Sequence, residues 1–226
     1  MALRILQVQQ TLPLEREYEG WITHSVERYF WTIGVHVNIW AVSPNVEKYW
    51  PADEVLSVDS KLIGIQMKRA KLGTASGPIS LSHLKWELGS PSGQLALVQQ
   101  IPEIYYCLPT FTNRDWRHSP LGHCLFWRPN QSSSDKNAWY DNPAAATSYC
   151  QLAKSPEAYR WGRFYELVTS CSIGKVLPAG ASAVGYVQEL AYSIRSQIEI
   201  AQSENMPVSE AITNGLYLVQ VPLNAV

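Results

Sequence analysis

One short apolar run constrains the fold of this chain more than any other stretch. Residues 61–67 read KLIGIQM, so large apolar side chains alternate with smaller or polar ones. Successive side chains of a strand point to opposite faces, so an alternation of this kind predicts a β-strand. Gln66 and Lys68 are two residues apart and therefore share a face. The run thus predicts an apolar strand that ends in an amide and an amine on the same side.

A second strand is expected just before it. Residues 54–58 are also mostly apolar, and the polar pair Asp59-Ser60 between the two runs is suited to a turn. A hairpin folded at that pair places Asp53 opposite Gln66. Opposed residues of an antiparallel pair share a face. The sequence therefore predicts that one acid, one amide and one amine converge on a small patch.

This combination of side chains suits metal-dependent cleavage of a phosphodiester. A carboxylate from Asp53 and an amide oxygen from Gln66 are ligands that Mg²⁺ or Mn²⁺ accepts. A bound metal lowers the pKa of a water molecule and screens phosphate charge. Lys68 beside it is placed to orient that water or to stabilise developing charge. The alternative is a polar hairpin with an ordinary solvated lysine and glutamine.

The same residues resemble a known family. Asp53, followed after a gap by Gln66-Met67-Lys68 at the end of an apolar strand, is similar to the PD-(D/E)XK nuclease superfamily, in the branch that has Gln at the second acidic position. The resemblance implies a restriction-endonuclease-like core and hydrolysis of nucleic acid, with Asp53, Gln66 and Lys68 as catalytic residues. Because Gln66 brings no charge, a metal would depend on Asp53 and on a further acid.

An N-terminal helix is the expected source of that acid. Over residues 14–30, apolar side chains recur every four positions, which predicts an amphipathic helix. Glu15 and Glu19 lie one turn apart on its flank. In the resembled family a first helix commonly supplies an acid to the metal site, and Glu19 is the expected ligand, with Glu15 in reserve. The alternative is a solvated flank whose acids favour the helix N-terminus.

The most basic segment follows the apolar strand. Arg69 and Lys71 lead into a glycine-containing loop over residues 71–82. A basic loop beside a metal site suits contact with a phosphate backbone. We therefore expect Arg69 and Lys71 to bind nucleic acid, with a solvated exit loop as the alternative.

The remaining patterns predict an α/β fold with a central mixed β-sheet flanked by helices. Further strands are expected at residues 31–42, 83–88, 103–108, 124–127 and 212–222, and further helices at 94–100, 157–168 and 183–203. Polar residues 130–143 suggest an internal boundary. The expected division is an α/β core over 1–130 and a C-terminal helical extension over 131–226, packed on the same domain. The 183–203 helix would pack on the sheet or join a homodimer or protein partner.

Composition bears on the class of the protein and on its expected location in the cell. Of 226 residues, 46% are hydrophobic, enough for a substantial core, and the net charge of −1 differs from the basic balance typical of nucleic-acid binders. No secretory signal or membrane-length apolar run is evident, and the four cysteines form no CxxC pair. We expect a cytoplasmic, reduced protein.

Two functions from different classes follow. The first is a magnesium-dependent nuclease, with DNA as the expected substrate, built on Asp53, Gln66, Lys68 and Glu19. The second is a non-catalytic protein of the same fold that binds or supports a larger assembly. The adjoining basic loop favours the nuclease, whereas the neutral Gln66 and the near-neutral charge favour the second.

Overall fold

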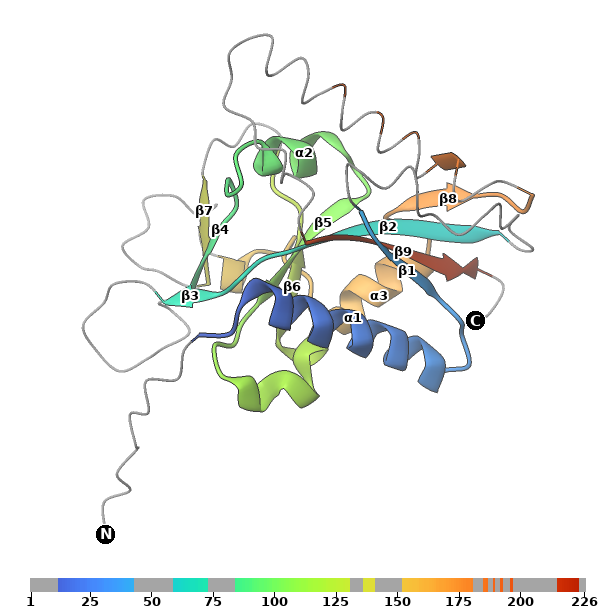
Figure 1. Ribbon diagram of the computed structural model, residues 1–226. Coiled ribbons are helices and arrows are strands. Elements are labelled where there is room, and N and C mark those ends of the chain that lie inside the picture. Colours follow the sequence, from blue (N-terminus) through green and yellow to red (C-terminus); the bar gives the residue numbers. More distant parts are fainter. Residues whose placement is uncertain are drawn as a thin grey trace.

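The protein has an α/β fold, as its sequence patterns predict. The computed structural model describes residues 12–42, 59–72, 84–130, 136–140, 152–180 and 215–223, together with positions 185, 186, 189, 192 and 196. Within these residues a mixed six-stranded sheet forms the centre, and helices cover both of its faces (Figure 1).

The central sheet has the strand order β1-β9-β2-β5-β6, and β8 pairs with the start of β2. The strands are β1 (Asn38–Ala41), β2 (Ser60–Met67), β5 (Ile104–Pro109), β6 (Cys124–Trp127), β8 (Lys175–Leu177) and β9 (Leu216–Pro222). Strands β2 and β5 are parallel, and the other pairs are antiparallel. The parallel pair requires a crossover, which contains helix α2 (Gln94–Gln100).

Strand β2 is the most enclosed element of the sheet. All eight of its residues are buried. Helices α1 (Glu15–Thr32) and α3 (Trp161–Thr169) lie on one side of the sheet, and α2 lies on the other (Figure 1). A strand covered on both faces is expected to be nearly continuously apolar, which explains why the KLIGIQM run contains few polar residues.

Helix α1 confirms the prediction for residues 14–30. Its apolar stripe is buried against the sheet and consists of Tyr18, Ile22, Val26 and Phe30. Its end is set by a glycine, because Gly34 adopts φ +77° and donates its N–H to the Trp31 carbonyl. Since the helix runs to Thr32 and then turns, β1 is shorter than the strand expected over 31–42.

A smaller sheet lies beside the central one. It has the order β3-β4-β7, formed by β3 (Lys71–Leu72), β4 (Leu84–Glu87) and β7 (Asn137–Trp139). Short 3-10 helices lie between the longer elements: η3 (Arg114–His118), η4 (Pro120–His123) and η6 (Leu152–Lys154). The predictions for α2 and β6 are confirmed at their stated bounds, and α3 begins four residues later than expected.

The expected hairpin pairing is wrong. Gln66 has Leu216 of β9 as its partner on one edge and Tyr106 of β5 on the other. A strand residue has only two ladder neighbours, so Asp53 is not the partner of Gln66. Asp53 itself and residues 54–58 lie outside the described residues.

The C-terminal part of the chain contributes strands as well as helix. β9 lies between β1 and β2, so residues on both sides of position 130 share one sheet. The expected helix over 183–203 is described at only five positions, all of them helical, so its packing and any partner stay predictions. Among the described residues, no helix combines the length and apolarity needed to cross a membrane.

Candidate functional site

The candidate site lies where β2 ends. Lys68 follows the last residue of β2, and only 2% of its surface is exposed. Its Nζ donates a hydrogen bond to the carbonyl of Ser90 and lies 6.0 Å from the centroid of the Tyr106 ring. Tyr106 is the β5 partner of Gln66. Because paired residues point to the same side of a sheet, the amine of Lys68 lies on the side to which Gln66 points.

Burial changes the acid–base behaviour of Lys68. Loss of solvent around the ammonium group lowers the pKa of Lys68 to about 8, although the carboxylate of Glu15 opposes this change. A lysine with such a pKa exchanges a proton readily near neutral pH. This is a chemical property that an ordinary exposed lysine lacks.

Glu19 and Gln66 approach each other around a glycine. Gly215 precedes β9 and adopts φ +74°, a conformation that favours glycine. A Cβ at this position would lie 3.1 Å from Glu19 Oε1 and 3.3 Å from Gln66 Nε2. The absence of a side chain at Gly215 therefore lets a carboxylate of α1 and an amide of β2 approach one small space.

Tyr217 holds the carboxylate of Glu19. Its hydroxyl donates a 3.0 Å hydrogen bond to Glu19 Oε2. Burial, together with the charge and hydrogen bond of Glu19, raises the pKa of Tyr217 to about 12, so this hydroxyl stays a donor over the physiological range. One oxygen of Glu19 is thus fixed by Tyr217, and the other lies toward Gly215.

Glu15 adds a second carboxylate one helical turn away. Its side chain is half-buried, and burial raises its pKa, while the nearby charge of Lys68 acts in the opposite direction. Glu19 also raises the pKa of Glu15, as like charges do at short range. Glu15, Glu19 and Lys68 therefore form one electrostatically linked group.

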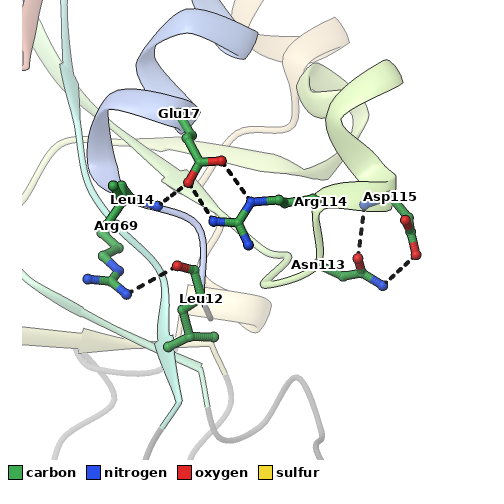
Figure 2. A network of polar contacts seen from close by, with 7 residues as sticks. All are labelled: Leu12, Leu14, Glu17, Arg69, Asn113, Arg114 and Asp115. Carbon is green, nitrogen blue, oxygen red and sulfur yellow. Dashed lines mark hydrogen bonds and ion pairs between the residues drawn. The ribbon is translucent and has the colours of Figure 1, made fainter. Parts of the chain in front are cut away.

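A polar network fixes the start of α1 (Figure 2). The guanidinium of Arg114 donates two hydrogen bonds to the carboxylate of Glu17, each of 2.7 Å, and the Leu14 N–H donates a third of 2.8 Å. These bonds hold the pKa of Glu17 at about 2. The start of α1 is thereby joined to η3, which positions Glu15 and Glu19 at the end of β2.

The two basic residues expected to contact nucleic acid have partners within the protein. Arg69 Nη2 donates to the Leu12 carbonyl at 3.4 Å (Figure 2). Lys71 forms a 2.6 Å ion pair with Glu87. The charge of Lys71 is therefore paired, whereas Arg69 contacts a neutral carbonyl, and the contact of both with nucleic acid stays a prediction.

The structure thus brings Glu19, Gln66 and Lys68 to the same end of the sheet, while Asp53 lies outside the described residues. Sequence reasoning missed Gly215 and Tyr217. Their positions depend on the pairing of β9 with β2, and no pattern in the sequence near either strand predicts that pairing.

Near Gly215, Glu19 Oε1 is an oxygen that suits a hard divalent cation, whereas the nearest Gln66 atom is the amide nitrogen Nε2, which donates to the Met67 carbonyl. Carboxylate and amide oxygens are the ligands that Mg²⁺ and Mn²⁺ prefer. No group of three His, Cys, Asp or Glu residues placed to hold a metal occurs within the described ranges, from which Asp53 is missing. The space around Gly215, which a Cβ would fill, and Glu19 Oε1 beside it fit such an ion when the amide of Gln66 turns its oxygen toward that space.

Comparisons of the chain with protein-family models, curated proteins and solved structures found no match.

Proposed function

We propose that this protein is a metal-dependent nuclease of the restriction-endonuclease-like type, with DNA as its expected substrate. The observation that carries the proposal is the convergence of Glu19 and Gln66 around Gly215, close to a buried lysine with a pKa of about 8. Perturbed pKa values of buried groups are characteristic of catalytic sites. The parallel pair of β2 and β5 with α2 in its crossover supports the fold assignment.

Glu19 and Gln66, with Asp53, are the residues that would hold Mg²⁺ or Mn²⁺. The ion would supply a water of lowered pKa and would screen the charge of the phosphate. Tyr217 keeps the carboxylate of Glu19 in one orientation through its 3.0 Å hydrogen bond. This fixed orientation matters because metal ligands that move out of position lower the rate of the catalysed reaction.

Lys68 is the residue to which we assign the handling of the proton or of the developing charge. The amide of Gln66 does not act as a base. Lys68, two residues further along the chain, has a pKa of about 8 and is therefore the group to which we assign this role. As the free amine it accepts a proton from the attacking water, and as the ammonium it stabilises the oxyanion of the phosphate. Its burial strengthens either interaction because water does not compete.

Single-turnover cleavage tests this assignment. Purified protein is incubated with labelled DNA or RNA, each single- or double-stranded, in Mg²⁺, Mn²⁺ or EDTA. Lys68→Met, which keeps the aliphatic stem and removes the amine, is expected to lower the rate about a hundredfold or more. Asp53→Asn is expected to lower both the rate and the affinity for metal. Arg163→Ala, on the exposed surface of α3, is the matched control and keeps the wild-type rate.

If Lys68→Met cleaves at the wild-type rate, the active site does not lie at this end of the sheet. Circular dichroism of each variant separates loss of chemistry from loss of folding.

A second function is favoured by one specific observation. The Nζ of Lys68 is bonded to the Ser90 carbonyl, and one oxygen of Glu19 is bonded to Tyr217. A site whose polar groups satisfy one another also suits a protein that keeps the fold and binds a partner without chemistry. Wild-type protein that binds nucleic acid but leaves every substrate intact in Mg²⁺ and Mn²⁺ would support this second function.

A further inference from the structure

A groove between α1 and the short helices η3 and η4 concentrates positive charge. Its volume is about 440 Å³, and the basic side chains that line it are His24, Arg28, Arg117 and His118. Hydroxyl groups of Ser25 and Ser119 also line it, and no Asp or Glu does. We call this the α1 groove. In a chain with a net charge of −1, such a one-sided lining is a local departure from the average.

The two arginines of the α1 groove are not committed to carboxylates. Among the described residues, ion pairs join Lys71 to Glu87, Arg114 to Glu17 and Arg163 to Glu166. Arg28 and Arg117 appear in none of these pairs, and both are exposed. Arg117 Nε donates a 3.3 Å hydrogen bond to His118 Nε2, a contact that does not use its Nη1 and Nη2 atoms. An exposed guanidinium with unused donors is a strong binder of phosphate oxygens.

The α1 groove is separate from the candidate site. Arg28 follows Glu19 by nine residues on α1, a rise of about 13 Å that also turns the side chain to the opposite side of the helix. A free nucleotide bound at one place does not reach the other. A polynucleotide does, because its charged phosphates repeat along the strand.

We propose that the α1 groove binds the phosphate backbone of a nucleic acid at a position away from the bond that is cleaved. The inference rests on the proposed function for the identity of the partner. Arg28 and Arg117 neutralise backbone phosphates, and the serine hydroxyls donate hydrogen bonds to phosphate oxygens. Trp116 precedes Arg117 on η3 and packs on the ring of His123, with centroids 4.2 Å apart; 48% of its surface stays exposed and offers a base a place to stack.

Fluorescence anisotropy with a labelled DNA oligonucleotide, in EDTA so that no cleavage occurs, tests the α1 groove. The double variant Arg28→Ala/Arg117→Ala is expected to lose affinity about tenfold or more, and the salt dependence of log K is expected to become shallower by about 2. Arg28→Lys/Arg117→Lys keeps the charge and is expected to retain most of the affinity. Arg163→Ala removes an exposed arginine of α3 and leaves binding unchanged.

The outcomes separate this inference from the proposed function. Unchanged affinity in the double alanine variant, or no binding by the wild type, overturns the inference. Affinity that falls in that variant while the wild type cleaves nothing in Mg²⁺ or Mn²⁺ supports the α1 groove and contradicts the nuclease. If tripolyphosphate at equal phosphate concentration displaces all the oligonucleotide, the α1 groove is a site for a free polyphosphate. That result would overturn the proposal that the groove binds nucleic acid.

Discussion

The two ends of α1 differ in whether a charged group is buried beside them. At its C-terminal end, the ring of Phe30 packs against Trp161 and Tyr165 of α3, with centroids 6.2 Å and 5.7 Å apart. At its N-terminal end, half-buried Glu15 and Glu19 approach the end of β2, where Lys68 is buried. One helix thus joins an apolar, aromatic region to a polar one.

Because the two ends of α1 bury different kinds of groups, we expect them to contribute differently to stability and to chemistry. Burying aromatic surface stabilises the fold and adds favourable ring contacts. Burying an amine such as Lys68 costs stability unless its partners compensate, and that cost appears as the lowered pKa. The aromatic end is therefore expected to control stability, and the polar end is expected to control chemistry.

The largest effect is expected from Phe164→Ala at the aromatic end. Phe164 is 1% exposed and stacks on Phe126 with centroids 4.3 Å apart. Its truncation leaves a cavity and should lower the free energy of unfolding by about 3–5 kcal/mol. Urea unfolding measures this, with Arg163→Ala next to it as the exposed control, which should change stability by less than about 0.5 kcal/mol. A small loss for Phe164→Ala would show that the aromatic end is not the stabilising one.

The second effect is a pH dependence that belongs to the polar end. The pKa of Lys68 is about 8 in the folded protein and ordinarily 10.5. Between these values the unfolded chain binds more protons, so stability rises with pH over this window, by up to about 1.4 kcal/mol per pH unit. Below about pH 8 the whole cost is present. Urea unfolding at several pH values from about 7 to 10.5 measures it.

Lys68→Met isolates the contribution of Lys68, because tyrosines and cysteines also titrate in this range. The slope of stability against pH should be smaller in the variant than in the wild type. Identical slopes would show that Lys68 keeps an ordinary pKa and would weaken its proposed role in proton transfer.

These two ends also show which parts of the molecule can be predicted from the sequence. The α1 stripe, the α2 helix and the β2 strand follow from periodicity, which is a local property, and the structure contains all three. Strand pairing is not local. Both β9 and a preceding apolar run are reasonable partners for β2, and the tight turn at Asp59-Ser60 favoured the wrong one.

The candidate site was predictable to a similar extent. Gln66 and Lys68 follow from strand spacing, Glu19 is expected from the family resemblance, and the structure places all three at one end of the sheet. Gly215 and Tyr217 come from β9, whose position depends on tertiary packing. No spacing rule connects them to Gln66.

The third effect compares two glycines at the two ends of α1. Gly215 and Gly34 have similar φ values, +74° and +77°, so alanine at either position should cost about 1–2 kcal/mol of stability. Only Gly215 has site residues close to its Cβ position, whereas nothing lies within 4 Å of that of Gly34. Gly215→Ala should therefore also lower cleavage roughly tenfold to a hundredfold by displacing Glu19 or Gln66. Equal cleavage by both variants would separate Gly215 from the chemistry.

The smallest effect is expected from Glu17→Gln, which breaks the anchor of the polar end without entering the site. The carboxylate of Glu17 accepts from Arg114 and from the Leu14 N–H, but it is partly exposed, so solvent screens the ion pair. We expect the thermal midpoint to fall by about 2–4 °C.

The folded pKa of Glu17 is about 2, against an ordinary 4.5, so its stabilising effect is complete above about pH 4.5 and is lost as the pH falls toward 2. Thermal unfolding of wild type and variant at neutral pH and at about pH 3 measures this, and the difference between them should shrink in acid. A difference that is equal at both pH values would mean that the Arg114 pair does not hold the first turn of α1, and the positions of Glu15 and Glu19 would then depend on the apolar stripe alone.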